Sequence, residues 1–275
     1  MNKVLIIAEL GVNHNGDEKL AMKMVKSAAE AGADIIKFHS YKAESVMTEQ
    51  TPLADYMKNS GSGSFIEMAR KYELDEAAIR RLKDYTESCG AEFLSSPFDL
   101  ESVCELQNLG VKRLKVPSGE LVNPPMLKAL AESRLPLIVS TGMATLHEVK
   151  WAVNFLKEHA SGDISLLHCL SQYPAEFQYA NLNAIKTLQE NFDIEIGYSD
   201  HTPGIEASVA AVALGATILE KHFTLDCSLE GPDQNASLEP VEFKRLVDAV
   251  RHIELAMGNG IKEPAKPEIA NRAIV

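Results

Sequence analysis

The chain has 275 residues, of which 45% are hydrophobic, and a formal net charge of −12 at pH 7. This length suits one large domain or two small ones, and the apolar content is enough for a full core. The negative charge argues against nucleic acid as a general partner, although lysines gathered at one place can still attract an anionic substrate.

Short apolar runs alternate with amphipathic stretches along almost the whole chain. The runs that predict strands are 4–8, 35–38, 92–94, 113–116, 137–139, 165–167, 195–198 and 218–220. The stretches that predict helices are 17–31, 75–88, 99–109, 124–133, 145–159, 182–190, 205–214 and 240–257. Strands that alternate with helices pair in parallel, and eight such units predict one closed (β/α)8 barrel, the TIM barrel.

The barrel is expected to be a single domain at residues 1–258, and the polar residues 259–275 a tail or the start of a linker. The connection at residues 40–74 is much longer than the others, and such a loop in a compact domain usually serves function. There is no apolar run near 18 residues, no signal peptide and no CxxC pair. We therefore expect a cytoplasmic protein without a membrane segment or a structural zinc site.

Polar residues stand at the C-terminal end of nearly every predicted strand, which is the face where TIM barrels carry their active sites. The cations and hydroxyls there form a mixture that suits a phosphate group. They are Lys37, Ser96, Lys115, Ser118, Ser140 and Ser199. Two other interpretations stay open: lysines solvated at the rim, and a Schiff base between a carbonyl substrate and Lys37, Lys115 or Lys221.

Two histidines follow the seventh and eighth predicted strands and would be neighbours at the barrel mouth. His201 and His222 could bind a divalent metal and leave positions open for substrate, or they could be a neutral, hydrogen-bonded pair. The carboxylates Glu9, Glu120, Asp200 and Asp233 could act as a general base or hold a sugar hydroxyl. Structural salt bridges and caps are the alternative for each of them.

Ordered motifs across the chain resemble the sialic acid synthases, which make N-acetylneuraminate and related nonulosonic acids such as legionaminate. The matching segments lie at residues 8–16 (AELGVNHNG), 36–38, 96–99, 115–120 (KVPSGE), 140–145, 167–169, 197–202 (GYSDHT), 220–226, 231–233 and 236–240. They occur in family order and cover almost the whole chain, so the ordered set rather than any one motif carries the resemblance.

The resemblance implies a reaction in which phosphoenolpyruvate condenses with N-acetylmannosamine or a related sugar and phosphate leaves by C–O cleavage. It implies that His201 and His222 bind Mn²⁺ or Mg²⁺ and that Glu120 transfers a proton with the attacking water. The six lysines and serines named above would hold phosphoenolpyruvate. Residues near the sugar would be Glu9, Asn59, Tyr173 and Asp233.

The chain departs from the family pattern at several positions. His39 stands where the family often has Gln, and Ser171 and Gln172 differ from the usual residues, so the exact sugar stays open. Family members usually continue into a small antifreeze-like domain that caps the partner's site in a homodimer, and the chain stops where that linker would begin. The alternatives are another phosphoenolpyruvate:aldose condensing enzyme, or a weakly active barrel that binds these ligands and needs a partner cap.

Overall fold

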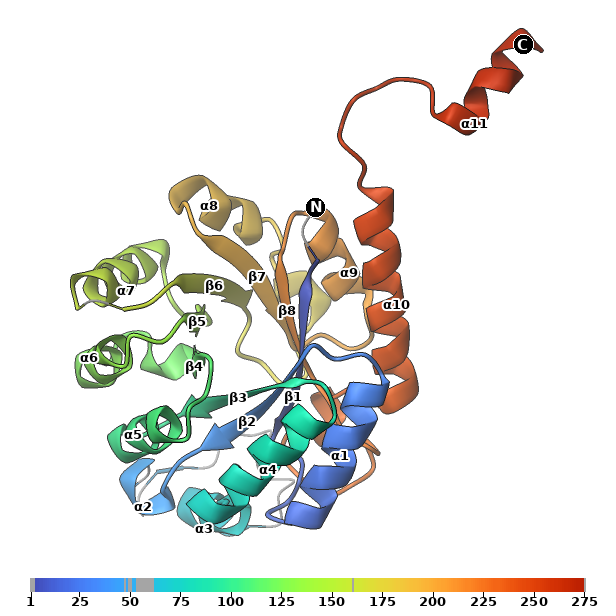
Figure 1. Cartoon of the computed structure of the whole chain (residues 1–275). Helices are drawn as coiled ribbons and strands as arrows, with labels where there is room; N and C mark the ends of the chain where they lie inside the picture. The colour runs from blue at the N-terminus through green and yellow to red at the C-terminus, as the bar shows by residue number, and fades with distance from the viewer. Residues whose placement is uncertain (1–2, 47, 49–50, 53–61, 160, 275) are drawn as a thin grey trace.

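The computed structural model describes residues 3–46, 48, 51–52, 62–159 and 161–274, in which strands and helices alternate (Figure 1). The strands are β1 (Leu5–Gly11), β2 (Ile35–Ser40), β3 (Glu92–Pro97), β4 (Leu114–Val116), β5 (Leu137–Ser140), β6 (Ile164–Cys169), β7 (Glu195–Asp200) and β8 (Ile218–His222). The helices are α1 (Glu18–Glu30), α2 (Ala43–Val46), α3 (Phe65–Tyr72), α4 (Glu76–Ser88), α5 (Leu100–Asn108), α6 (Pro124–Glu132), α7 (Leu146–Glu158), α8 (Ala184–Asn191), α9 (Glu206–Ala213), α10 (Pro240–Ala256) and α11 (Lys266–Ile269).

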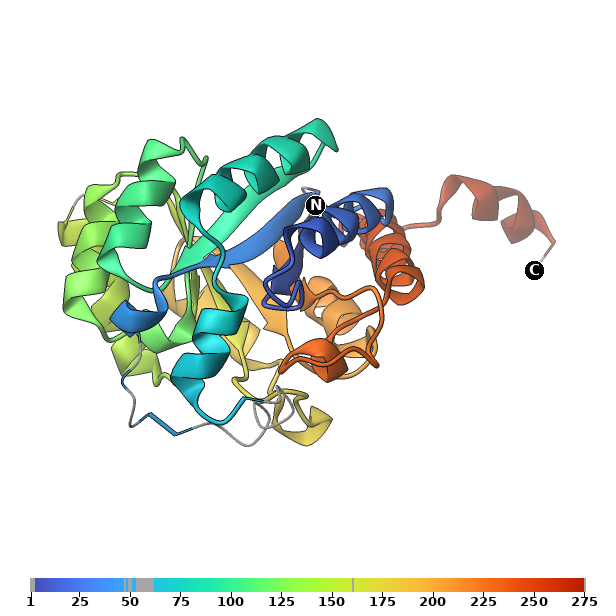
Figure 2. The same ribbon diagram turned by 90° about the horizontal axis from the view of Figure 1, so that it is seen from below.

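The strands form one sheet in the order β3-β2-β1-β8-β7-β6-β5-β4, and the paired strands are parallel. The strands at the two ends of this order, β3 and β4, also contact each other, so the sheet curls into a nearly closed barrel. Helices surround it in both views (Figure 2). This arrangement confirms the predicted TIM barrel.

Alternate strand residues point into the barrel, and the layer nearest the strand N-termini is apolar. Its almost fully buried members are Ile7, Ile35, Leu94, Ile138, Leu167 and Ile218. On β7 this level is occupied by Gly197, where a Cβ atom would collide with the carbonyl oxygen of Ile218 and lie 2.5 Å from Leu167. A glycine is therefore needed for the side chains of the two neighbouring strands to close the layer.

Most helices begin where the sequence predicts because a side chain caps the first turn. Asp17, the first residue of the stretch predicted at 17–31, accepts hydrogen bonds from the backbone of Lys19 and Leu20 at the start of α1. Thr145 and Glu148 form a reciprocal capping box at the start of α7. The apolar faces of the barrel helices then pack on the outside of the sheet to form the main core.

The long connection after β2 contains two helices, α2 and α3, that the sequence pattern did not predict. Helix α3 is tied to the barrel by the Tyr41 hydroxyl, which donates to the carbonyl of Ala69 at 3.0 Å. The backbone of Ala43 donates to Glu73 at 2.9 Å, next to the end of the same helix. The loop after β1 also touches α3, because a Cβ on Gly16 would collide with the carbonyl oxygen of Lys71. These contacts hold α3 over the strand C-termini.

The C-terminal residues leave the barrel after α10. Residues 255–272 are exposed, and α11 stands apart from the barrel in both views (Figures 1 and 2). Among the described residues, no helix combines the length and the apolar character that a membrane span requires.

Lys221 on β8 points away from the barrel interior and forms a buried ion pair with Asp200 of β7. The two side chains are 0% exposed, and Lys221 Nζ lies 3.0 Å from Asp200 Oδ2. The same carboxylate accepts hydrogen bonds from the hydroxyls of Thr202 and Ser208 at 2.8 and 2.6 Å. A buried carboxylate is tolerated only when it is paired and hydrogen-bonded in this way.

We expect Lys221→Met to destabilise the protein by about 3–5 kcal/mol, because the Asp200 charge would be buried without its cation. Equilibrium unfolding in urea measures the change. The control is Lys244→Met, since Lys244 and Asp248 form a half-exposed pair on α10 whose loss should cost under about 1 kcal/mol. Equal effects of the two substitutions would contradict the argument.

Candidate active site

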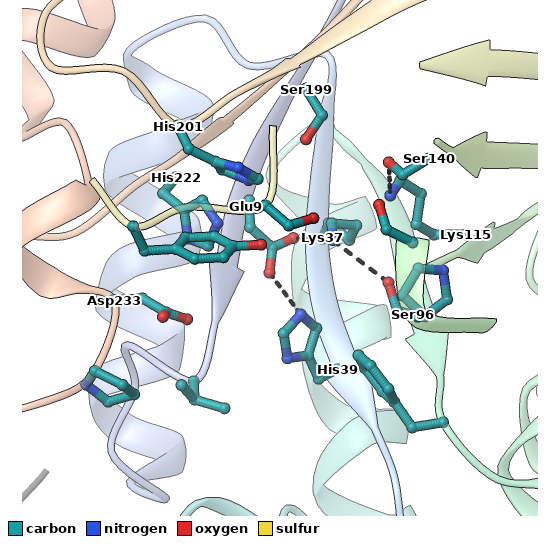
Figure 3. Close-up of a pocket in the computed structure, with 18 of the residues that line it drawn as sticks. Glu9, Lys37, His39, Ser96, Lys115, Ser140, Ser199, His201, His222 and Asp233 are labelled. Carbon is teal, nitrogen blue, oxygen red and sulfur yellow. Dashed lines mark hydrogen bonds and ion pairs between the residues drawn. The ribbon is translucent and has the colours of Figure 1, made fainter. Parts of the chain in front are cut away.

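A cavity of about 420 Å³ lies at the C-terminal ends of the strands, directly above the apolar layer (Figure 3). At the level two positions beyond that layer, each strand places one residue in the cavity wall. In strand order these residues are Glu9, Lys37, Ser96, Lys115, Ser140, Cys169, Ser199 and Glu220. The period-two alternation of the strands therefore brings eight polar, ionisable or nucleophilic side chains to one level.

Most residues that the sequence predicted for the site line this cavity. They are Glu9, Lys37, Ser96, Lys115, Ser118, Ser140, Tyr173, Ser199, His201, His222 and Asp233. Glu120 is not among the lining residues, and its Oε2 accepts a hydrogen bond of 2.6 Å from Asn123 Nδ2 in the turn after β4. Asn59 lies outside the described residues. The roles of all these residues in binding and catalysis stay predictions.

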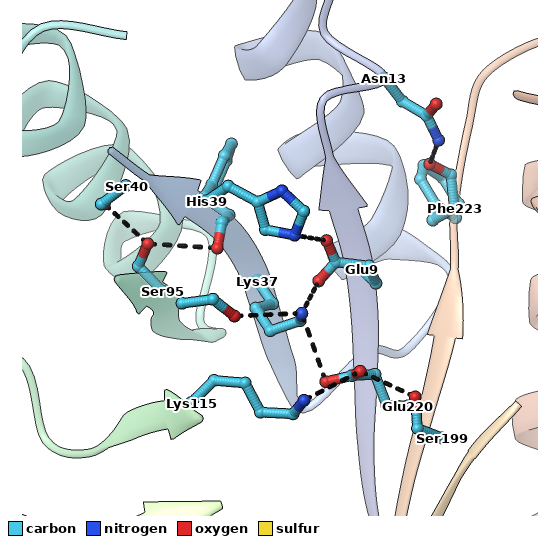
Figure 4. A network of polar contacts seen from close by, with 12 residues as sticks. Glu9, Asn13, Lys37, His39, Ser40, Ser95, Lys115, Ser199, Glu220 and Phe223 are labelled. Atoms are coloured by element: carbon cyan, nitrogen blue, oxygen red, sulfur yellow. Dashed lines mark hydrogen bonds and ion pairs between the residues drawn. The ribbon is translucent and has the colours of Figure 1, made fainter. Parts of the chain in front are cut away.

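A chain of buried ion pairs crosses the centre of the cavity (Figure 4). Glu220 lies between two lysines, with carboxylate oxygens 3.5 Å from Lys37 Nζ and 3.5 Å from Lys115 Nζ. Lys37 also lies 2.5 Å from Glu9 Oε2. Ser199 donates a hydrogen bond of 2.9 Å to Glu220. The two positive and two negative charges balance, which is what allows four ionised groups to share a buried site.

Hydroxyl groups lie beside the two ammonium groups. Lys115 Nζ donates a hydrogen bond of 2.6 Å to Ser140 Oγ, and Lys37 Nζ lies 3.4 Å from Ser96 Oγ. The hydroxyl of Ser118 accepts from the backbone of Gly142 at 2.9 Å on the same side of the cavity. Ammonium groups with neighbouring hydroxyls can replace the hydration shell of a phosphate or carboxylate.

The charges of this network fix the ionisation of its members. Burial opposes the charge on Glu9, but Lys37 and His39 hold the pKa of this carboxyl well below its usual range. Burial likewise opposes the charge on Lys37, but Glu220 and Glu9 raise its pKa. The pKa of Lys115 is lowered, because burial and the nearby charge of Lys37 outweigh the attraction of Glu220. The site thus holds one firmly charged lysine and one that gives up its proton more easily.

Sequence reasoning missed Glu220 and Cys169 as residues of the site. Glu220 was assigned to the end of an apolar run, and it proves to be the carboxylate that both lysines share. Cys169 Sγ lies 3.9 Å from His201 Nδ1. Both residues follow an inward apolar residue by two positions, after Ile218 and Leu167. Because inward-facing residues alternate along a strand, counting two positions onward from each inward apolar residue would have identified both.

His201 and His222 lie side by side, with ring centroids 5.2 Å apart. His201 Nδ1 contacts the carbonyl of Leu170 at 2.7 Å, which leaves its other nitrogen for a ligand. His222 Nδ1 is buried and has no hydrogen-bond partner among the described residues. Burial first, and then the nearby His201, lower the pKa of His222, so its imidazole is neutral, the form that binds a metal.

The two histidines supply at most two ligands, so a divalent ion bound to them would take its other ligands from water or substrate. The described residues contain no group of three or more His, Cys, Asp or Glu arranged to hold a metal, so the two histidines stand alone. Burial alone would lower the pKa of His201, but Cys169 and the Leu170 carbonyl raise it. An ion that binds to His201 would therefore compete with a proton for the ring.

Three polar side chains converge over Gly11 at the other side of the cavity. His39 Nε2 lies 3.0 Å from Glu9 Oε1. Gly11 has a φ of +48°, and a Cβ built on it would lie 2.7 Å from Glu9 Oε1 and 3.5 Å from Asp233 Oδ2. The ring centroid of Tyr173 lies 4.2 Å from that of His201. This group of acceptors and donors suits the hydroxyl groups of a sugar.

Asp233 ionises at a higher pH than an ordinary aspartate. Burial is the main cause and the charge of Glu9 adds to it, while His39 and His201 act in the opposite direction, and together they raise its pKa to about 6. A carboxyl group with this pKa can give or take a proton near neutral pH.

Comparisons with known proteins identify the family of the chain. The NeuB family model matches residues 24–262. The chain is 48% identical over 279 aligned positions to the N,N'-diacetyllegionaminic acid synthase of Campylobacter jejuni, covering 100% of this chain and 84% of that protein. It is 46% identical to the enzyme of the same name from Legionella pneumophila, covering 98% of this chain and 78% of that protein.

A solved structure extends the likeness from sequence to shape. The N-acetylneuraminic acid synthetase of Leptospira borgpetersenii, in complex with citrate, superposes with a TM-score of 0.87 at 37% identity. The alignment covers 99% of this chain and 91% of that one. The resemblance inferred from the sequence motifs is confirmed, and the chain belongs to the NeuB family of sialic acid synthases.

Proposed function

We propose that this enzyme joins phosphoenolpyruvate to the aldehyde of an acylamido sugar and releases phosphate, which makes a nonulosonic acid. The observation that carries the proposal is the cavity itself, in which two lysines, five serines and two neighbouring histidines converge in a member of the NeuB family. The two relatives named for N,N'-diacetyllegionaminic acid support an acceptor that bears acylamido groups.

The lysine side of the cavity is the proposed site for phosphoenolpyruvate. Its phosphate and carboxylate oxygens need several donors, and the donors here are Lys37, Ser96, Lys115, Ser118, Ser140 and Ser199. The carboxylates of Glu9 and Glu220 hold the two ammonium groups in place before the anion arrives. The anion then meets groups that are already ordered, so little side-chain entropy is lost on binding.

We propose that His201 and His222 hold Mn²⁺ or Mg²⁺. Such an ion would polarise the aldehyde of the acceptor and offset part of the negative charge that phosphoenolpyruvate brings into a balanced site. The pair fits the ion because His222 Nδ1 is buried without a partner and both rings face the cavity.

The acceptor is proposed to lie between the histidines and the group of Glu9, His39 and Asp233. The C3 atom of phosphoenolpyruvate forms a bond to the aldehyde carbon, whose oxygen must then take a proton. Water adds at C2, and the C–O bond to phosphate breaks. Asp233, with its pKa of about 6, is the proposed proton donor to the aldehyde oxygen. Glu120 stays the predicted partner for the proton of the attacking water.

The proposal predicts that phosphate is released from phosphoenolpyruvate only when an acylamido sugar aldehyde is present. We expect release with N-acetylmannosamine and Mn²⁺, and a loss of at least about 100-fold after treatment with EDTA, because the carbonyl would no longer be polarised. A colorimetric phosphate assay measures both. Release without any sugar would contradict the condensation. Binding of both ligands without release would favour a barrel that needs a partner cap.

Lys115→Met should lower kcat/KM for phosphoenolpyruvate by about 100-fold, because it removes a charge-assisted donor from the anion. Steady-state kinetics at saturating sugar measure the change, and thermal unfolding checks that the variant is folded. The matched control is Lys112→Met, an exposed lysine just before the start of β4 that does not line the cavity. If borohydride instead trapped a ligand covalently on Lys115, the Schiff-base mechanism would replace this one.

Asp233→Asn should stabilise the protein at neutral pH. The folded pKa of about 6 lies above the unfolded value of 3.8, so wild-type stability falls as the pH rises from about 4 to 6. The asparagine variant lacks this loss, and its advantage should grow from near zero at pH 4 to about 3 kcal/mol at pH 7. Urea unfolding at both pH values measures it, with exposed Asp193→Asn as the control. An advantage that is the same at both pH values would contradict the assignment.

A further inference from the structure

A carboxylate lies in the floor of the part of the cavity that collects cations and hydroxyls. The side chain of Glu220 lines the cavity and is 5% exposed. Strands β8 and β4 are four places apart in the ring of strands, so the ion pair of Glu220 with Lys115 spans the barrel just above the apolar layer (Figure 4). An anion that binds to Lys37 and Lys115 must therefore lie beside a group of its own charge.

Glu220 acts on the two lysines mainly through its charge. Its oxygens lie 3.5 Å from each ammonium nitrogen, whereas a strong charge-assisted hydrogen bond is about 2.7–2.9 Å long. Lys115 donates at 2.6 Å to Ser140 instead, and Glu220 accepts its own hydrogen bond from Ser199 at 2.9 Å. An ammonium group has three N–H donors, so Lys115 keeps a donor that a ligand can use.

The second carboxylate of the network has a different place. Glu9 lies beside Lys37 and His39, at 2.5 and 3.0 Å, on the side of the cavity proposed for the sugar. Among the described residues, Glu220 is the only carboxylate within ion-pair distance of Lys115. It is also the one that faces both lysines. An anion that binds to Lys115 therefore competes first with Glu220.

The remainder of the cavity offers an anion no other lysine or arginine. Lys37 and Lys115 are the only such side chains among the described residues that line it. The half of the cavity beside helix α3 is apolar, with Phe65, Met68 and Ala69 in its wall. A phosphate buried against these side chains would lack a cation, which is strongly unfavourable. Phosphate at the lysines therefore has to bind next to Glu220.

Substrate and product differ in how well they can offset the repulsion from Glu220. Phosphoenolpyruvate carries a carboxylate and a phosphate, so it can contact several donors of the site at once. Inorganic phosphate has one such group and makes fewer contacts, while the repulsion remains. A repulsion of fixed size therefore leaves the substrate bound and makes the product a weak ligand. Weak binding of the product favours turnover, because tight binding of a released group only slows the enzyme.

We propose that Glu220 is a built-in counter-anion that weakens the binding of inorganic phosphate at Lys37 and Lys115, so that phosphate leaves after the C–O bond of phosphoenolpyruvate breaks. The inference rests on the proposed function for the identity of the product. It goes beyond that function because it assigns Glu220 a role in the release step. Glu220 is a positioning residue here, since it acts on the ligand through the charge of the lysines.

The test is a calorimetric titration of inorganic phosphate into wild type and Glu220→Gln, in chloride buffer of constant ionic strength. Glutamine keeps the shape of the side chain and removes its charge. We expect Glu220→Gln to bind phosphate at least about tenfold more tightly than wild type. The variant should melt at a lower temperature without phosphate, and phosphate should raise its melting temperature more than that of wild type. A purely structural role would lower stability with no gain in affinity.

Asp200→Asn is the matched control, because it removes a carboxylate from a buried lysine pair that does not line the cavity. It changes the net charge by the same amount and should lower stability, with the affinity for phosphate unchanged. The double variant of Lys115→Met with Glu220→Gln removes the whole pair. It should lose the gain in phosphate affinity, because the cation for which phosphate and Glu220 compete is gone.

Three results of these titrations would overturn the inference. They are a phosphate affinity of Glu220→Gln that is unchanged or lower, an equal gain in Asp200→Asn, and a full gain in the double variant. If Glu220→Gln unfolds in chloride buffer, phosphate should restore its fold by taking the place of the lost carboxylate. Failure of phosphate to do so would count against the inference as well.

Kinetics extend the test to the reaction. Phosphate should inhibit Glu220→Gln at concentrations at least about tenfold lower than wild type, in competition with phosphoenolpyruvate, and kcat should fall together with KM. Inhibition of both proteins at the same concentration would contradict the inference. If no sugar supports phosphate release by wild type, the titration still decides. A gain in phosphate affinity would then support the role of Glu220 and reject only the reaction, and no gain would overturn the inference itself.

Discussion

The carboxylate of Glu220 between two buried lysines is the interaction on which the site depends. Lys37 and Lys115 come from β2 and β4, and like charges at one level of a barrel repel each other unless an anion lies between them. Glu220 reaches both from β8, and Glu9 adds a second carboxylate on the Lys37 side. Without a ligand the four charges cancel, and the barrel can bury them next to an apolar layer at modest cost.

The ionic part of the site is built on strands, whereas His201, Tyr173 and Asp233 follow them in loops. The apolar layer and the ionic layer are two residues apart on the same strands, so each charged group inherits its position from a packed neighbour below it. Lys221 shows the same alternation of side chains on the outer face of β8. It is one residue away from Glu220, points out of the barrel, and pairs with Asp200 instead of taking part in the site.

The fold and most of the site could be predicted because both follow the period of the strands. The eight strands and the capped helices were predicted close to their observed bounds, and the strand-end lysines, serines and histidines line the cavity. Glu220 was missed because it was counted as the last residue of an apolar run, although its side chain points into the barrel. Helix α3 was missed because its stripe of four residues is short and follows a polar, glycine-bearing segment, so local pattern gave no reason to separate it from a loop.

The two halves of the cavity therefore differ in how they are held. The ionic half is fixed by the register of the paired strands. A shift of one strand by one residue would turn its charged side chain away from the cavity. The apolar half belongs to an excursion that is fastened to the barrel by a few contacts, among them the Tyr41 hydroxyl and the Arg70–Glu44 pair. Sequence change in that excursion can alter the wall without disturbing the lysines. A barrel of this design can keep its ionic layer on the strands while an excursion between two of them forms another wall of the same cavity.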